Sequence, residues 1–436
     1  IPPTNFYWVG GSGNWNNPNS WSYTSGGNPG VCPIPTRFDN VFFDVNSFSA
    51  PNQYVNLNTT AEFNNMLWAN VNHPRLVGGG QMNVYGSFQL DPNLSYEASG
   101  WVQFRSKTAG NVIKTAGKKL YYVRFDGESQ STGEWTLKDN LDVTYDLYID
   151  RGTFISDGHD ISARMFYCCT ESPTTVDLTG TKFVDVSNQF RIYPNNFNLI
   201  MDKADIRFTG TNQFYFIGGN NTYNDILMTA SNTGNSYIEF QYYNTIDNVK
   251  IAASGYQTIR FYHNSTYNDI DVEYQNPTNN IPYFYLEGSN TINDLSITSI
   301  GNAGPYIYLN GNNTFNNLVS AGVGTRLYPR GNTTQRVNDA LAIGSGGFPV
   351  FFQSQNPGTQ ATFYKPSGTV CLDYVWMRDI KATSDFDALG NPKTNFYAGN
   401  NSVDLGNNTN WSFSSCDGYY WVGGSGNWSD PNHWAT

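Results

Sequence analysis

The chain has 436 residues and a net charge of −11, with 14 % charged and 16 % aromatic residues. This negative balance argues against nucleic-acid binding, which needs a basic face, and suits an extracellular surface. No stretch of about 18 apolar residues could span a membrane, and the many Asn, Gly, Tyr and Phe residues favour strands and tight turns over helices. Because Ile1 looks like an internal start, we expect any targeting signal to lie outside this sequence.

Residues 1–60 are rich in Trp, Gly, Asn and Pro, and they contain a motif that recurs near the other end of the chain. The run YWVGGSGNW begins at Tyr7 and again at Tyr420, and a Pro, an Asn and a Trp follow in the same register. Internal repetition of this kind indicates a tandem array. We therefore interpret residues 1–60 as an N-terminal cap or inter-unit joint. The predicted joint residues are Trp8, Trp15, Trp421 and Trp428.

Two acidic residues in this first segment form a candidate calcium site. Asp39 and Asp44 stand on either side of a short apolar run, and carboxylate oxygens are usual ligands of Ca²⁺. We expect no other cofactor, so the alternatives are a structural calcium ion at this pair or no cofactor at all.

Residues 61–345 carry a second, much shorter repeat. Thr222, Thr245, Thr266, Thr291 and Thr314 follow one another at spacings of 23, 21, 25 and 23 residues, usually with an Asn directly before the Thr. Apolar residues stand five and seven positions before each Thr, which indicates strands with one buried face. A period near 23 residues with short strands is typical of a parallel β-helix, so we predict a right-handed coil of roughly 12 turns in which matched Asn side chains form ladders.

The positions six and eight before each Thr should point outward, since side chains alternate along a strand. Many of them are aromatic, and aromatic faces stack on sugar rings, so a glycan-binding stripe is one interpretation. The other is that the column packs against a loop or a neighbouring repeat, or stiffens the sheet by cross-turn stacking. The predicted stripe residues are Phe216, Tyr237, Tyr283, Tyr285, Tyr306 and Tyr308.

Signatures of catalysis are absent from the sequence: it contains no HExxH, GxSxG or P-loop motif. A β-helix lyase or hydrolase would need clustered carboxylates or calcium ligands with a basic residue. Asp225, Asp269 and Asp294 share one aligned position, and Asp271 and Arg260 lie near it. We interpret these carboxylates as a solvated column at a turn, and we predict no catalytic residues and no enzymatic activity.

The end of the chain divides into two predicted segments. Residues 346–416 should form the terminal turns and a C-terminal cap, and residues 417–436 should begin the next repeat. Cys371 and Cys416 flank the last turns and are predicted to form a disulfide, since no CxxC pair suggests zinc. The adjacent Cys168 and Cys169 could bond each other only with strain, which leaves buried thiols as the alternative.

Two strings resemble the repeats of very large surface proteins of the Bacteroidetes, the SprB-like gliding-motility adhesins of flavobacteria. They are YWVGGSGNWSDPNHW at 420–434 and FYAGNNSVDLGNN at 396–408, the latter followed by Trp411. The resemblance implies a giant cell-surface filament that is exported by the type 9 secretion system, associated with the outer membrane and moved by the gliding machinery. It brings no catalytic residues with it.

The sequence therefore predicts an all-β, secreted repeat protein with a mechanical role. We expect a structural and adhesive unit of a cell-surface filament that attaches cells to a substratum or polysaccharide, with neighbouring repeats as partners. The alternative is a carbohydrate-active β-helix enzyme, or a carbohydrate-binding module of a polysaccharide-degrading protein.

Overall fold

A computed structural model describes residues 3–30, 32–128, 133–168, 174–193, 197–201, 203–210, 213–231, 236–254, 257–275, 281–300, 304–343, 348–416, 420–421, 426–427 and 434–435. The chain is a β-solenoid of about 14 turns with parallel strands, which confirms the predicted parallel β-helix. The described part contains a single short 3-10 helix, η1 (Pro18–Ser20). None of its helices is long and apolar enough to cross a membrane.

Two compact units make up the solenoid and are described separately. Unit 1 consists of Ile1–Met228 and Phe240–Ile246, and unit 2 of Thr229–Glu239 and Asp247–Thr436. Three strands each contain a boundary between the units, namely β25 (Ile226–Ser231), β26 (Ser236–Gln241) and β27 (Thr245–Ser254).

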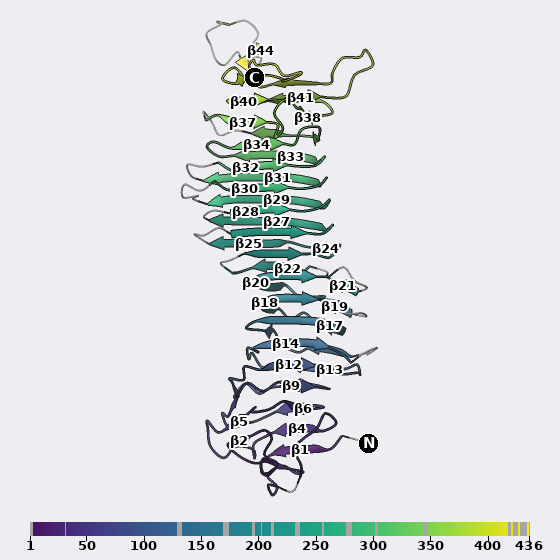
Figure 1. Cartoon of the computed structure of the whole chain (residues 1–436), viewed down its shortest axis with the longest axis vertical. Coiled ribbons are helices and arrows are strands. Elements are labelled where there is room, and N and C mark those ends of the chain that lie inside the picture. Colours follow the sequence, from purple (N-terminus) through teal and green to yellow (C-terminus); the bar gives the residue numbers. More distant parts are fainter. Residues whose placement is uncertain are drawn as a thin grey trace. The chain divides into compact units, whose positions relative to one another are not determined.

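Unit 1 is built from parallel stacks of short strands, each strand pairing with the one a turn later (Figure 1). The first stack is β4 (Asn40–Phe43), β7 (Met66–Trp68), β10 (Phe88–Gln89), β13 (Asn111–Lys114), β15 (Glu134–Leu137), the end of β17 (Asp146–Ile155), β19 (Thr174–Asp177) and β21 (Phe197–Ile200). The second is β6 (Ala61–Phe63), β9 (Met82–Val84), β12 (Trp101–Phe104), β14 (Tyr122–Asp126), the start of β17, β18 (Ile161–Cys168), β20 (Phe183–Ile192) and β23 (Phe214–Ile217). Beside them run β16 (Leu141–Asp142) and β22 (Asp205–Phe208), β24 (Thr222–Tyr223), and a stack of β2 (Gly13–Asn14), β5 (Tyr54–Asn56), β8 (Arg75–Val77) and β11 (Ser95–Tyr96).

An aromatic cluster closes the N-terminal end of unit 1. Strand β1 (Asn5–Trp8) pairs antiparallel with β3 (Trp21–Ser22) and parallel with β4. The indoles of Trp8, Trp15 and Trp21 are buried, and the Trp21 ring meets those of Trp8 and Trp15 edge-on, at centroid distances of 5.1 and 5.0 Å. Parallel pairing is therefore present within residues 1–60, where β1 lies on β4.

Unit 2 follows the repeat of about 23 residues that the Thr spacing predicts. One stack is β28 (Gln257–Phe261), β30 (Tyr283–Leu286), β32 (Tyr306–Leu309), β34 (Arg326–Pro329), β37 (Val350–Gln353), β40 (Val375–Arg378) and β43 (Val403–Asp404). The other is β29 (Thr266–Gln275), β31 (Thr291–Ile300), β33 (Thr314–Ala321), β35 (Thr334–Val337) with β36 (Leu341–Ile343), β38 (Ala361–Tyr364) and β41 (Ile380–Thr383). The inward residues, such as Phe284 with Ile307 and Leu286 with Leu309, are register partners and are buried.

A buried polar ladder runs along unit 2 through the residues before Thr266, Thr291 and Thr314 and through Gln335, which lies next in register. The Asn290 Oδ1 atom accepts a hydrogen bond from the Ser265 backbone N–H at 2.9 Å, and the Asn313 Oδ1 atom accepts one from the Asn290 backbone N–H at 2.9 Å. The Asn313 Nδ2 atom donates in turn to Gln335 Oε1 at 2.9 Å. These are the predicted Asn ladders, and they satisfy groups that would be costly to bury alone.

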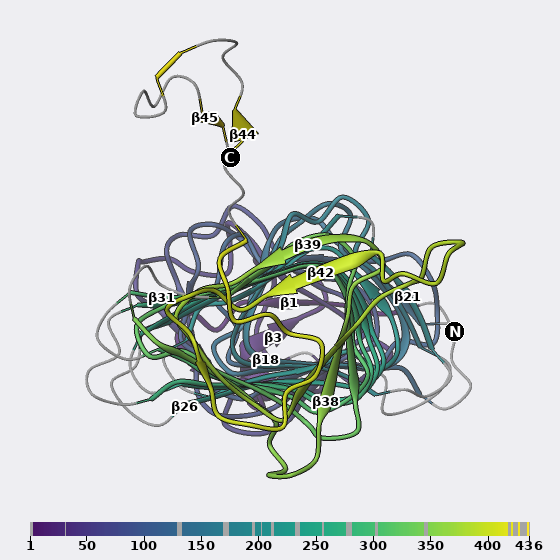
Figure 2. The same cartoon turned by 90° about the horizontal axis from the view of Figure 1, so that it is seen from above.

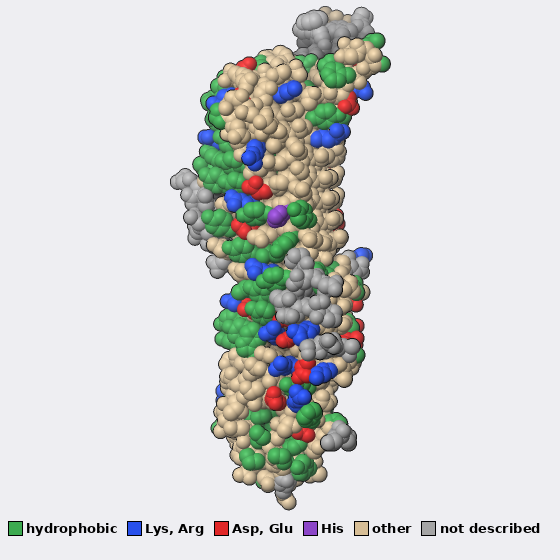
Figure 3. All heavy atoms as spheres, turned by 45° about the vertical axis from the view of Figure 1, so that its right-hand side comes forward, with side chains coloured by type: hydrophobic (Ala, Val, Ile, Leu, Met, Phe, Trp, Pro, Cys, Tyr) green, Lys and Arg blue, Asp and Glu red, His purple; other side chains and the backbone are tan. Residues whose placement is uncertain are grey.

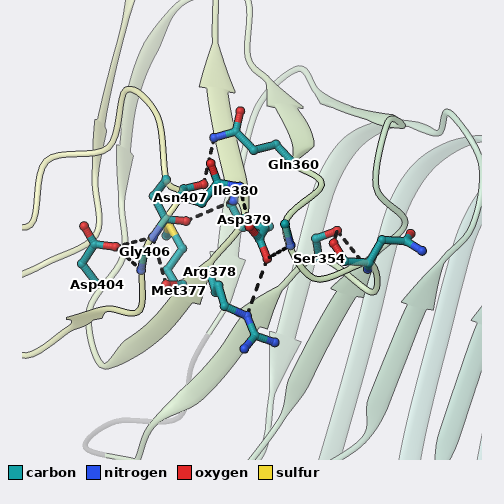
Figure 4. A network of polar contacts seen from close by, with 12 residues as sticks. Ser354, Gln360, Met377, Arg378, Asp379, Ile380, Asp404, Gly406 and Asn407 are labelled. Carbon is teal, nitrogen blue, oxygen red and sulfur yellow. Dashed lines mark hydrogen bonds and ion pairs between the residues drawn. The ribbon is translucent and has the colours of Figure 1, made fainter.

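A network of polar contacts (Figure 4) and a disulfide hold the C-terminal turns of unit 2. The buried Asp379 carboxylate accepts hydrogen bonds from the Gly358 backbone N–H at 3.0 Å and from the Asn407 amide. Strands β39 (Gly368–Cys371) and β42 (Thr394–Tyr397) lie side by side here (Figure 2). Cys371 is bonded to Cys416, the predicted pair, with their Cα atoms 5.7 Å apart.

The second copy of the Trp motif repeats the strand pairing of the first. Strand β44 (Tyr420–Trp421) pairs antiparallel with β45 (Trp434–Ala435), with Trp421 opposite Trp434, as Trp8 is opposite Trp21 in β1 and β3. The Trp421 side chain and all of Trp428 lie outside the described residues, so the predicted burial of these two joint residues stays a prediction.

Candidate functional site

Outward side chains of unit 2 form two adjacent columns on β28, β30, β32 and β34. One column contains Tyr283 and Tyr306, and the other contains Tyr285 and Tyr308, each pair being register partners. All four rings are half-buried. The repeat places them there because each turn carries the same alternation of inward and outward residues. The structure therefore brings four of the six predicted stripe residues together, and we call this the tyrosine ladder.

The rings of the tyrosine ladder contact one another. The Tyr285 and Tyr308 rings are stacked with centroids 4.7 Å apart, and those of Tyr283 and Tyr306 meet edge-on at 5.4 Å. Burial and the neighbouring tyrosine hydroxyls raise the pKa of Tyr308 to about 12, so its hydroxyl stays a hydrogen-bond donor at neutral pH. Part of the ring area is thus used in cross-turn stacking, which is the stiffening role that the sequence left open.

Arginine and further aromatic residues extend the ladder in both directions. The Arg260 guanidinium lies 4.4 Å from the Tyr285 ring centroid, and the Arg326 guanidinium lies 4.7 Å from that of Tyr306. Beyond them, Phe351 pairs with Trp376, their rings meeting edge-on at 5.1 Å. The outward face therefore combines aromatic rings with guanidinium groups. Figure 3 shows one face of the molecule, on which hydrophobic, basic and acidic side chains are interspersed.

Sequence analysis missed the second half of this face. Tyr328 tilts against Tyr308 at 5.4 Å, and Phe351 and Trp376 follow in the same columns. The repeat is weak in the sequence beyond Thr314, because the corners there change length. The alternating runs Arg326–Pro329 and Val350–Gln353 were the available signal.

The two remaining predicted stripe residues differ from the ladder. Tyr237 is 41 % exposed, as predicted. Phe216 is fully buried, and its ring lies 5.6 Å from the buried ring of Phe240, so its assignment to the outer stripe was wrong. Six positions separate Phe216 from Thr222, whereas five separate Phe240 from Thr245. The extra corner residue shifts the alternation by one and reverses which side chains face inward.

The predicted calcium residues are not brought together. Asp39 directly precedes β4 and Asp44 directly follows it. At the usual rise per residue of a strand, their Cα atoms are about 16 Å apart. The Asp39 carboxylate accepts hydrogen bonds from the Thr36 backbone N–H and hydroxyl, at 2.9 and 2.7 Å. The Asp44 carboxylate accepts from the Asn46 backbone N–H at 2.9 Å. Each carboxylate completes a local turn, and within the described residues no group of three or more acidic, His or Cys residues is arranged to hold a metal.

The aligned Asp residues of unit 2 form a column that amides bridge. The Asn293 Nδ2 atom donates to Asp269 Oδ1 at 3.3 Å, and the Asn317 Nδ2 atom donates to Asp294 Oδ1 at 2.6 Å. Arg260 is on the other stack, where it lies over a tyrosine ring. This arrangement resembles a hydrogen-bonded turn and does not gather an acid and a base around a common point.

Comparisons with protein-family models, with curated proteins and with solved structures find no match to this chain. The functional argument therefore depends on the geometry of the described residues.

Proposed function

We propose that this chain is a structural and adhesive unit of a cell-surface filament and that the tyrosine ladder contacts glycans. The observation that carries the adhesive part is the row of half-buried rings and guanidinium groups along unit 2, because soluble proteins seldom leave so many aromatic side chains in register on one face. Aromatic faces bind the apolar faces of sugar rings, and guanidinium groups donate to hydroxyls.

The paired Trp motifs support the tandem part of the proposal. The two copies share nine consecutive residues and the same Trp-to-Trp antiparallel pairing. Residues 417–436 are thus proposed to begin a second repeat, built like the first turn of this one. The complete coding sequence tests this directly: further copies at the same spacing are expected, and a single copy of the motif pair would contradict it.

A binding assay with immobilised polysaccharides tests the adhesive part. We expect the double variant Tyr285→Ser, Tyr308→Ser to lose most of the retention of the intact chain. The matched control is Tyr23→Ser, Tyr54→Ser, which removes two exposed tyrosines of unit 1. Equal retention of wild type and ladder variant, with unchanged circular dichroism, would leave cross-turn stiffening as the role of the ladder.

The same samples distinguish an adhesive unit from a carbohydrate-active enzyme. Release of new reducing ends or unsaturated products from the polysaccharide would favour the carbohydrate-active alternative. The resemblance to gliding adhesins extends the proposal to export by the type 9 system and to display on the outer membrane. Antibody labelling of intact producing cells is the expected result, and labelling only after lysis would contradict it.

A further inference from the structure

An open depression in unit 1 lies on the outward face of β12, β14 and β17. Its volume is about 330 Å³, and it is lined by Trp101, Arg124, Tyr148 and Asp150. Trp101 comes from β12, Arg124 from β14, and the other two from β17. Three successive turns therefore contribute one or two residues each. The volume lies at the lower end of the range for small-molecule sites.

A β-bulge places the carboxylate of this site. Phe125 pairs with Ile149, but the next residue, Asp126, pairs with Arg151, so Asp150 is the extra residue of β17. The bulge breaks the alternation, and Ile149 and Asp150 are both buried. Bulges re-aim side chains and are common beside binding sites. A carboxylate buried in this way is costly without charged partners.

The charged partner of Asp150 is at the mouth of the depression. The Arg124 Nε atom lies 2.7 Å from Asp150 Oδ2, and the Asp150 side chain is 2 % exposed whereas that of Arg124 is 38 % exposed. Asp126 lies between two guanidinium groups, 3.6 Å from Arg124 and 3.7 Å from Arg151. Among the described residues, two positive and two negative side chains meet here, so their charges balance and favour a neutral ligand over an ionic one.

Each of the two aromatic walls stacks on a ring of the next turn. The Trp101 and Tyr148 ring centroids are 5.8 Å apart with an interplanar angle of 43°, so the rings diverge and do not stack on each other. Trp101 stacks instead on Tyr122 at 4.7 Å, and Tyr148 stacks on Tyr167 at 4.8 Å. Neither wall can rotate away without losing its partner. The site is therefore preformed.

We propose that this depression binds a neutral sugar ring. The rings of Trp101 and Tyr148 offer surfaces for the apolar face of a pyranose, and the Arg124–Asp150 pair offers a donor and an acceptor to adjacent hydroxyls. Burial raises the pKa of the Tyr148 phenol, which keeps its hydroxyl protonated as a further donor. The site is separate from the tyrosine ladder, and the inference does not depend on glycan binding by unit 2.

The test uses the whole 436-residue chain. A printed array identifies the probe. It carries neutral oligosaccharides and, for comparison, the same oligosaccharides bearing uronate or sulfate groups. Isothermal titration calorimetry then measures the affinity of the chain for the neutral probe. Trp101→Ala and Arg124→Gln are each expected to weaken binding of the neutral probe by about tenfold or more. Circular dichroism melting shows that the variants are folded. Arg124→Gln combined with Asp150→Asn removes both charges of the pair together, keeps the aromatic walls and serves if Trp101→Ala or Arg124→Gln does not fold.

The control is the ladder variant Tyr285→Ser, Tyr308→Ser, which should bind the neutral probe with an affinity within about twofold of wild type. Unchanged affinity in both Trp101→Ala and Arg124→Gln overturns the site in unit 1. So does an array on which only acidic glycans, or none, bind. If the ladder variant alone loses binding, the sugar site in unit 1 is wrong while the proposed function of the ladder stands.

Discussion

The N-terminal end of unit 1 and the regular turns of unit 2 stabilise the parallel coil with different interiors. At its N-terminal end unit 1 buries Trp8, Trp15, Trp21 and Trp68 around Phe43, which is stacked on Trp68 at 3.8 Å. Unit 2 buries a ladder of amide side chains that hydrogen-bond from turn to turn. Large aromatic rings can fill the core of an irregular terminal turn, because their packing does not depend on a repeated backbone geometry. An amide ladder needs turns of the same geometry to keep its hydrogen bonds in register.

The outer faces differ in the same way. The tyrosine ladder depends on strict repetition, and its rings stack on their own copies one turn away. The depression of unit 1 depends on an interruption, since the bulge at Asp150 opens the face and supplies the carboxylate. Regular turns thus build a continuous surface, and a break in the repeat builds a local site.

Removing the central ring of the aromatic cluster should have the largest effect. Trp21 is fully buried between Trp8 and Trp15, and its Nε1 atom donates to the Trp15 carbonyl at 3.0 Å. Trp21→Ala should lower the stability of the first turns by about 3–5 kcal/mol. Hydrogen exchange, read by mass spectrometry, should accelerate in β1, β3 and β4, because a solenoid can open locally.

A tryptophan of unit 2 is the matched control for this change. Trp376 is 37 % exposed and meets the Phe351 ring edge-on, so Trp376→Ala should cost less than about 1 kcal/mol. If the backbone amides of β1 and β4 exchanged at the same rate in Trp21→Ala and Trp376→Ala, the claim that aromatic packing closes the N-terminal end of unit 1 would be wrong.

Cutting the polar ladder should have the next largest effect, and it should be confined to unit 2. Asn290→Ala removes the acceptor of the Ser265 backbone N–H and leaves buried groups unpaired, at about 2–3 kcal/mol. Exchange should accelerate in β29, β31 and β33. Asn293→Ala, on the exposed column, should stay within about 0.5 kcal/mol of wild type. Equal effects of the two would mean that the ladder contributes no more than a surface amide.

The contrast between the units also explains what the sequence could predict. Alternation identified Phe284, Ile307 and the tyrosines beside them, since one period holds through these turns. It failed at Phe216, where one added corner residue reverses the two faces. It could not reveal Asp150, because a bulge depends on pairing between turns and leaves no local signature in the chain.

Titration of the tyrosine ladder should give the smallest effect. Burial raises the pKa of Tyr308 to about 12, from an unfolded value near 10. The folded state therefore holds this proton more tightly than the unfolded state, so the contribution to stability is complete below pH 10 and is lost as the pH rises towards 12. Tyr308→Phe should flatten the fall of the unfolding midpoint over this range, by a modest amount because the ring is half-exposed to solvent. Tyr54→Phe, which removes an exposed phenol hydroxyl of unit 1, is the matched control. Parallel slopes for wild type and Tyr308→Phe would show that the stacked ladder does not protect its hydroxyls, and the ladder would then offer its rings to solvent as freely as isolated surface tyrosines do.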